Sequence, residues 1–108
     1  MSLPNWARTA DRGNKERLTQ LAMRDLAERV GEDVTSGAIT VKEIVPVTWE
    51  DMSLGYPSPG RRPAPGLIPG YQIILLHSGR EYDYHSGFGR VLYVPPGKGR
   101  PALPADEL

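Results

Sequence analysis

The sequence contains no cysteine, carries no net charge and has no long apolar run, and each absence excludes a class of protein. Without cysteine there is no disulfide, no thiolate zinc ligand and no cysteine nucleophile. Thirteen basic and thirteen acidic residues cancel, so no overall field attracts nucleic acid or an anionic membrane. No apolar stretch reaches the roughly 18 residues of a membrane span, and the N-terminus lacks a signal-peptide core. We therefore expect a cytoplasmic protein, with secretion of a processed chain as the alternative.

Residues 71–93 predict three antiparallel strands joined by two tight turns. An apolar run comes first, and a segment that alternates tyrosine with polar residues follows it. Ser78-Gly79 between them suits a primed two-residue turn, which requires positive φ, and this turn pairs His77 with Arg80. A second turn at residues 86–89 leads into the last strand of the meander.

This register divides the meander into two faces. Tyr82 and Tyr84 share one face with the aliphatic residues opposite them, and this face is the predicted core. The last strand extends the same face by placing Val91 opposite Tyr84. The other face is predicted to be exposed to solvent. Its polar residues are Glu81, Asp83 and His85.

Residues 14–30 predict one amphipathic helix. Apolar residues recur there at three- and four-residue spacings, with charged residues mostly elsewhere around the helix. Asn14 can cap its start and Gly31 can end it. A helix this short needs a partner in water, and the apolar face of the sheet is the natural one. Residues 1–13 show no period and are expected to form a flexible arm.

Residues 38–49 predict the first strand, because β-branched residues dominate them. Lys42-Glu43 interrupts the alternation, so either a bulge lies there or Glu43 points inward with a partner. Pro46 cannot donate to a ladder, so the strand lies at an edge or the proline faces away from its neighbour. The order of helix, strand and meander is typical of an α+β domain. We predict one helix packed on a four-stranded, mainly antiparallel sheet within residues 14–94.

Two segments rich in proline and glycine flank the meander. The connection at residues 53–70 holds five prolines and four glycines, and loops of this length are often functional or disordered. Proline limits its freedom, so it can present Tyr56, Arg61 and Arg62 at a low entropy cost on binding. The alternative is a semi-rigid crossover without a role in binding. Residues 95–108 are predicted to be a disordered tail.

Few residues could carry chemistry. Glu81, Asp83 and His85 alternate along one strand, so their side chains share a face and could bind a metal ion. The same alternation is also typical of a face exposed to solvent. His77 and His85 lie at opposite ends of the predicted hairpin, and no nucleophile elbow is present. We therefore predict no catalytic residue, no metal site and no cofactor. The predicted binding residues are Tyr56, Arg61, Arg62, Glu81, Asp83 and His85.

An ordered series of short motifs resembles an uncharacterised family of small bacterial proteins. The series is VTW at residues 47–49 with Asp51, SLG at 53–55, PxPG at 57–60, PGY at 69–71 and YxYH at 82–85. Members typically read VTWPDxSLGCPxPG, PGYxIxL and YxYH, so Tyr56 stands where they have cysteine and Glu50 where they have proline. The resemblance covers about residues 18–93 and implies a fold but no activity. The order of elements is also similar to the PepSY type of domain, which is associated with peptidase regulation.

These observations leave three functions from different classes. The first is a non-enzymatic protein-binding or regulatory module, of the peptidase-inhibitor kind, that uses the proline-rich loop and the exposed sheet face. The alternative is a single-stranded nucleic-acid-binding protein, whose binding would weaken steeply with salt. The third is a metal-dependent hydrolase centred on Asp83 and His85. The basic residues of the nucleic-acid alternative are Arg61, Arg62, Arg90, Lys98 and Arg100.

Overall fold

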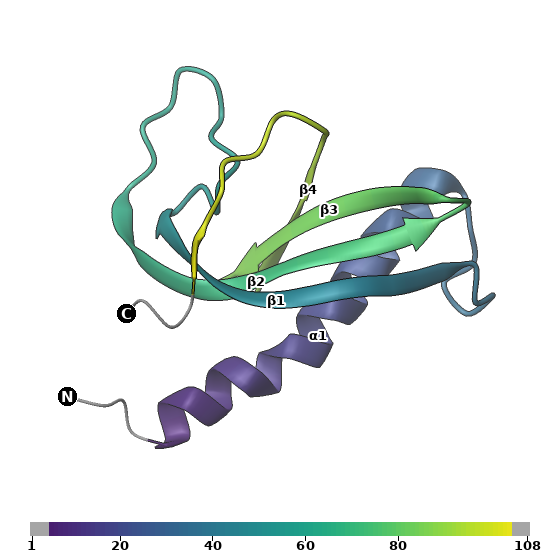
Figure 1. Cartoon of the computed structure of the whole chain (residues 1–108), viewed down its shortest axis with the longest axis horizontal. Coiled ribbons are helices and arrows are strands. Elements are labelled where there is room, and N and C mark those ends of the chain that lie inside the picture. The colour runs from purple at the N-terminus through teal and green to yellow at the C-terminus, as the bar shows by residue number, and fades with distance from the viewer. Residues whose placement is uncertain (1–4, 105–108) are drawn as a thin grey trace.

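The computed structural model describes residues 5–104, and the side chains of residues 15–103 within them. One helix precedes a five-stranded antiparallel sheet with the strand order β4-β3-β2-β1-β5 (Figure 1). The elements are α1 (Asn5–Val30), β1 (Ile39–Asp51), β2 (Pro65–His77), β3 (Arg80–Gly87), β4 (Arg90–Val94) and β5 (Leu103–Pro104). The predicted α+β class and the four antiparallel strands β1 to β4 are confirmed. A transmembrane helix is not found among the described residues.

The hairpin of β2 and β3 has the predicted register, with His77 opposite Arg80. Its turn has φ of 51° at Ser78 and 78° at Gly79, as a primed turn requires. The second turn differs from the prediction, because β3 continues to Gly87 and the turn consists of Phe88 and Gly89 alone, with φ of 51° and 70°. Two positive φ angles in succession make this another primed turn, which needs only two residues. As a result, the partner of Tyr84 is Tyr93 and not Val91.

The helix packs on the predicted core face of the sheet. Apolar residues spaced along one side of α1 meet the aliphatic and aromatic residues of β2 and β3, as the two periodicities predict. Burial of each large side chain in such a core contributes about 1.5–3 kcal/mol. The buried residues of this main core are Leu18, Ala22, Leu26, Ala27, Ile39, Tyr71, Ile73, Leu75 and Tyr84.

A polar link also joins the helix to the sheet. The Tyr84 hydroxyl donates to Asp25 Oδ2 at 2.7 Å, and Arg29 Nε donates to the same oxygen at 2.6 Å. The Arg29 guanidinium also lies 4.7 Å from the centre of the Tyr93 ring, a cation–π distance. Burial raises the pKa of Tyr84 well above its usual value, and the hydrogen bond to Asp25 raises it further. The hydroxyl therefore remains a donor at any physiological pH.

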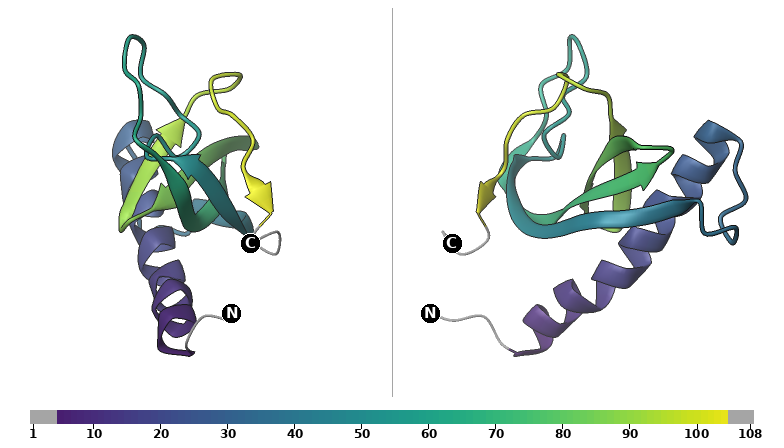
Figure 2. Two further views of the ribbon diagram at one scale, coloured as in Figure 1. Left: turned by 90° about the vertical axis from the view of Figure 1, so that its left-hand side faces the viewer. Right: turned by 45° about the vertical axis from the view of Figure 1, so that its right-hand side comes forward.

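The helix begins at Asn5, nine residues before the predicted start at Asn14. Residues 5–13 were predicted to belong to a flexible arm, because they lack an apolar period. They continue the helix beyond the sheet (Figures 1 and 2). Alanine and arginine favour a helix, and one glycine at position 13 costs only about 1 kcal/mol. Residues 1–4 of the predicted arm lie outside the described residues.

The first strand has the irregularity that its sequence predicts. Its register against β2 shifts between Val41 and Glu43, so the bulge falls at Lys42. Glu43 is exposed, which excludes the alternative in which it points inward. Beyond β1 lies only the two-residue strand β5, so most of β1 forms an open edge among the described strands. A proline at position 46 is compatible with this place in the sheet.

Parts of both proline-rich segments belong to the sheet. The loop between β1 and β2 spans residues 52–64, because residues 65–70 belong to β2. The tail was predicted to be disordered, but residues 95–101, here called the strap, lead from β4 across the sheet to β5, which pairs with β1 (Figure 2). The strap crosses the face opposite α1. Residues 105–108 of the predicted tail lie outside the described residues.

Candidate functional site

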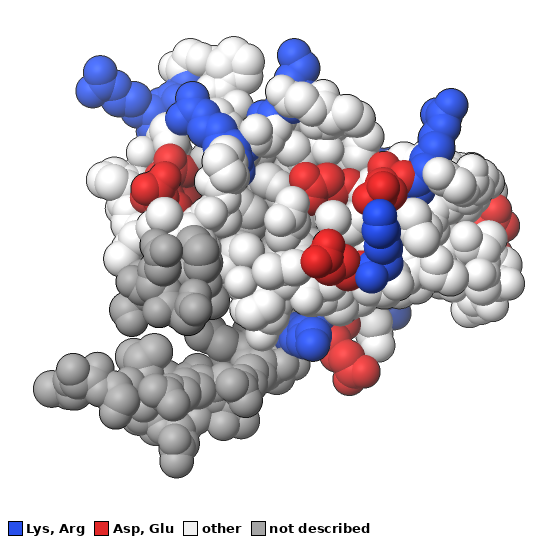
Figure 3. Space-filling view, in the orientation of Figure 1, with Lys and Arg blue, Asp and Glu red and all other residues white. Residues whose placement is uncertain are grey.

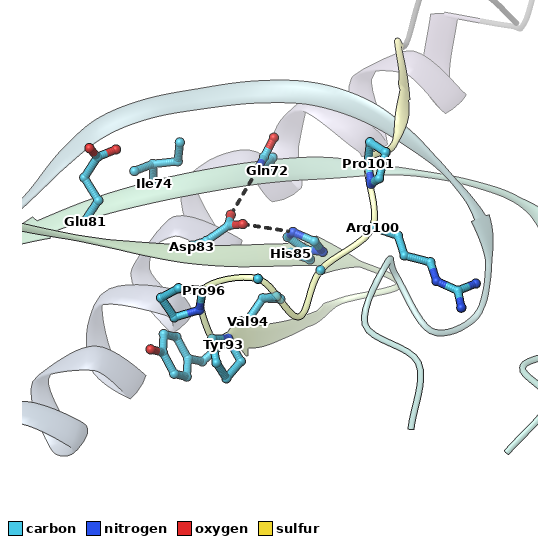
Figure 4. Close-up of a pocket in the computed structure, with 13 residues that line it drawn as sticks. Gln72, Ile74, Glu81, Asp83, His85, Tyr93, Val94, Pro96, Arg100 and Pro101 are labelled. Carbon is cyan, nitrogen blue, oxygen red and sulfur yellow. Dashed lines mark hydrogen bonds and ion pairs between the residues drawn. The ribbon is translucent and has the colours of Figure 1, made fainter. Parts of the chain in front are cut away.

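A pocket of about 440 Å³ lies between the strap and the sheet face opposite α1 (Figure 4). Its floor is formed by residues of β2 and β3, and its roof and walls by the end of β4 and by the strap. The floor residues are Gln72, Ile74, Glu81, Asp83 and His85. The volume is within the range of about 300–1,000 Å³ that is typical of ligand sites. The pocket occupies the face that was predicted to be open to solvent.

His85 lies at the inner end of the floor, and every polar atom of its ring has a partner. Nδ1 lies 2.6 Å from the carbonyl oxygen of Leu54, so this nitrogen carries a proton and donates it. Nε2 lies 3.3 Å from Oδ2 of Asp83. The ring stacks on Trp49, with 4.4 Å between centroids. His85 is only 2% exposed, so the prediction that it faces solvent is wrong.

A second, smaller core explains why His85 is buried. Val47, Trp49, Leu54 and Ile68 pack together on the pocket side of the sheet, where the loop folds back over β1 and β2. Trp49 therefore packs under the loop. The indole Nε1 donates to the backbone oxygen of Ser86 at 2.8 Å, which fixes Trp49 beneath the histidine ring.

The loop and the strap meet above this ring pair. The amide of Arg100 donates to the carbonyl oxygen of Gly55 at 2.7 Å. A Cβ at Gly55 would lie 2.8 Å from the Arg100 oxygen, and one at Gly99 would lie 2.9 Å from a methyl of Val94 and 3.2 Å from His85 Cε1. Glycine at these two positions therefore allows the loop and the strap to close over His85.

The carboxylates of the floor differ in their surroundings. Asp83 accepts a hydrogen bond from Nε2 of Gln72 at 3.2 Å and faces His85 with its other oxygen. Glu81, at the open end, forms an ion pair of 3.1 Å with Lys42, and both side chains are about half exposed. Asp83 is thus held in place by neighbours within the pocket, whereas Glu81 is part of the solvated surface.

Basic side chains gather at the end of the molecule formed by the loop and the strap. Figure 3 shows lysine and arginine over these two segments with one acidic group beside them, and further acidic groups over the middle of the sheet. Four of these side chains are exposed and form no ion pair with any described residue. They are Arg61, Arg62, Lys98 and Arg100, here called the cationic rim. Arg90 differs, because its Nη2 donates to the Met52 oxygen at 2.9 Å and holds the base of the loop.

The structure thus places the six predicted binding residues in two groups. Glu81, Asp83 and His85 line the pocket, whereas Arg61 and Arg62 lie on the exposed loop outside its lining. Tyr56, half-buried in the same loop, does not line the pocket either. The strap, Gln72 and Ile74 were not predicted as parts of a site. The predicted hairpin register pairs Ile74 with Asp83, so it could have indicated Ile74.

The chemistry available in the pocket is limited. Within residues 15–103, no group of three or more histidine, aspartate or glutamate side chains is arranged to hold a metal ion. The hydroxyl of Ser86, next to His85, donates to the backbone oxygen of Tyr71 at 2.9 Å and is fully buried. Asp83, Gln72 and the backbone of the strap can donate or accept hydrogen bonds, and Ile74 offers apolar contact. The arrangement suits binding.

Comparison with known proteins gives one result. Residues 19–94 match the model of a family described as a domain of unknown function (DUF8738). No curated protein and no solved structure gives a significant match. The matched residues comprise the C-terminal part of α1, all of β1 to β4 and the loop between β1 and β2, and they end where the strap begins. The chain belongs to this family of unknown function, as the resemblance to an uncharacterised family implied.

Proposed function

We propose that the protein is a non-enzymatic binding module and that a segment of a partner protein occupies the pocket under the strap. The observation that carries this proposal is the pocket itself. It is lined by β2, by β3 and by the end of β4 together with the strap, and neighbouring contacts hold these segments in place. The Trp49–His85 stack, the Leu54 carbonyl and the strap are joined by hydrogen bonds and close contacts. A binding surface that is ordered before the partner arrives loses less entropy on association.

The hydrogen bonds that the polar side chains already form within the protein support a binding role over catalysis. His85 is buried and both of its ring nitrogens face acceptor oxygens, so the ring is not poised to take a proton from a substrate. Ser86 is likewise committed to a backbone oxygen. Asp83 and Gln72 remain partly exposed on the floor and can make the few oriented hydrogen bonds that a binding pocket uses.

A regulatory role, of the peptidase-inhibitor kind, is the narrower form of this proposal. It is supported by the order of helix, strand and meander, which resembles that of the PepSY type of domain. We also infer that the motif series of residues 47–85 is a signature of the family to which the chain belongs.

The proposal is tested by placing a photoreactive phenylalanine analogue at position 74 and, as a control, at position 28. Ile74 lines the pocket, whereas Glu28 is exposed on the helix at the other face of the sheet. We expect a protein that crosslinks from position 74 only. The purified protein should then bind wild type and Glu28→Trp equally, and bind Ile74→Trp at least tenfold more weakly. Equal crosslinking from both positions, or none from position 74, would remove the proposal.

Single-stranded nucleic acid is the second candidate partner, and the gathering of the cationic rim at one end of the molecule favours it (Figure 3). Such binding would depend mainly on phosphate contacts, so its affinity would fall steeply with salt. The test is titration of a labelled oligothymidylate at 50 and 200 mM NaCl. No binding at the lower salt concentration would exclude this candidate.

A further inference from the structure

We propose that the partner segment is acidic and that its carboxylates contact the cationic rim while one uncharged side chain enters the pocket. This inference rests on the proposed function and names the chemistry of its ligand. The rim residues, Arg61 and Arg62 on the loop and Lys98 and Arg100 on the strap, are all exposed.

The rim gathers four cationic side chains without an ion pair to any described residue on two adjacent segments. Elsewhere on the described surface, Arg29 pairs with Asp25 and Lys42 with Glu81. Arg24 and Arg80, which also form no ion pair with a described residue, lie on separate elements. No acidic side chain lies within ion-pair distance of a rim residue among residues 15–103. With overall charge balanced at thirteen basic and thirteen acidic residues, this cationic surface is a local feature and not the result of a basic chain.

The two segments that carry the rim act as one surface. The 2.7 Å hydrogen bond from the Arg100 amide to the Gly55 oxygen joins the loop to the strap beside the pocket. Prolines restrict both segments, since the loop contains Pro57, Pro59 and Pro63 and the strap has three more. Such a backbone holds the charged groups near one another before binding, which favours a partner that contacts several of them at once.

The floor of the pocket distinguishes an acidic peptide from a nucleic acid. Asp83 and Glu81 would repel a phosphodiester chain that followed the strap into the pocket, because every nucleotide carries a negative charge. A peptide can instead place an uncharged side chain against Ile74 and keep its carboxylates at the rim. Single-strand binding also uses several stacked rings. Of the described aromatic side chains only Phe88 is exposed, and it lies on the turn between β3 and β4.

Three fluorescein-labelled probes test the inference by anisotropy at 50 mM NaCl. The first is a pentapeptide with a central leucine and two glutamates on each side, the second has lysine in place of glutamate, and the third is a ten-nucleotide oligothymidylate. We expect the glutamate peptide to bind at least tenfold more tightly than either other probe. Raising NaCl to 200 mM should weaken it several-fold, because added salt shortens the Debye length, which is about 10 Å at 0.1 M, and so screens exposed charges more strongly.

Two double variants with the same change in net charge locate the site. Arg61→Glu with Arg62→Glu alters the rim, whereas Arg24→Glu with Arg80→Glu alters two exposed arginines, one on α1 and one at the start of β3. The first variant should lose at least tenfold in affinity for the glutamate peptide, and the second should lose less than twofold. All four positions are exposed, so both variants should fold, which circular dichroism verifies.

Each other outcome overturns the inference in a distinct way. Equal binding of the lysine peptide would show that charge does not select the ligand, and tighter binding of the oligothymidylate would make nucleic acid the ligand. Equal losses in both variants would show that overall charge is responsible. If no probe binds at 1 mM protein, the acidic ligand is excluded. The proposed function then stands or fails separately on crosslinking from position 74.

Discussion

Replacement of Gly70 by alanine should destabilise the protein more than any other exchange of glycine for alanine outside the loop and the strap. A Cβ at Gly70 would lie 1.9 Å from the backbone oxygen of Ser86 and 2.9 Å from Nε1 of Trp49. A carbon and an oxygen need about 3.3 Å between them. The two strands must therefore separate by more than an ångström at a point where Gly70 pairs with Gly87 and the Ser86 oxygen accepts the Trp49 indole.

The magnitude follows from two contributions. Overpacking a well-packed site costs about 1–3 kcal/mol. Loss of a buried hydrogen bond that leaves its acceptor without a partner costs about 1–3 kcal/mol more. The free energy of unfolding of Gly70→Ala should therefore fall by about 2–6 kcal/mol, a large part of the roughly 5–15 kcal/mol typical of a native protein.

Urea unfolding followed by far-UV circular dichroism measures this loss, with Gly60→Ala as the matched control. Gly60 has φ of 76° and nothing within 4 Å of an added Cβ, so its substitution introduces backbone strain alone, about 1–2 kcal/mol. If Gly70→Ala destabilises the protein no more than Gly60→Ala does, the close approach of β2, β3 and Trp49 does not exist in solution.

Two further predictions concern single hydrogen bonds. Trp49→Phe removes the indole donor to the buried Ser86 oxygen and should lower the free energy of unfolding by about 2 kcal/mol; an unchanged urea midpoint would contradict this. Burial and Asp25 raise the pKa of Tyr84, so above about pH 10 the unfolded chain ionises this hydroxyl while the folded protein does not. Stability is then lost as the pH rises past that value, and Tyr84→Phe should reduce the loss between pH 8 and pH 10.5. An equal loss in wild type and variant would refute this account.

The hairpin could be predicted from the sequence because local chemistry and burial agree there. A primed turn at Ser78-Gly79 fixes the register, and the same register places the aliphatic and tyrosine side chains on one face for α1 to cover. At the second turn the local sequence allows more than one turn, and the predicted register of β4 was wrong. Ser86, Gly87 and Gly89 are all of turn-forming type, so a four-residue turn was predicted at 86–89. Phe88-Gly89 alone forms the turn, and the β4 register therefore differs from the prediction by two residues.

The site could not be predicted, because it depends on contacts between segments far apart in the chain. The alternation of Glu81, Asp83 and His85 correctly predicted that the three side chains share one face of the sheet. It did not predict that the strap covers this face. Nothing in the sequence around His85 indicates that Trp49 stacks beneath it or that the Leu54 oxygen accepts a hydrogen bond from its Nδ1. These partners lie more than 30 residues away, and only the folded loop brings them together.

The strap shows most clearly how amino-acid composition alone can mislead a structure prediction. A segment with prolines and glycines and almost no apolar side chains is predicted to be disordered, because it cannot bury enough surface to offset its lost entropy. Here proline reduces that entropy before folding, and glycine at position 99 permits contact with His85 that any side chain would obstruct. One backbone hydrogen bond to Gly55 and the short pairing of β5 with β1 then suffice to hold the segment. Because these contacts order the strap before binding, a partner that enters the pocket loses less entropy than it would if the roof of the pocket had to become ordered first.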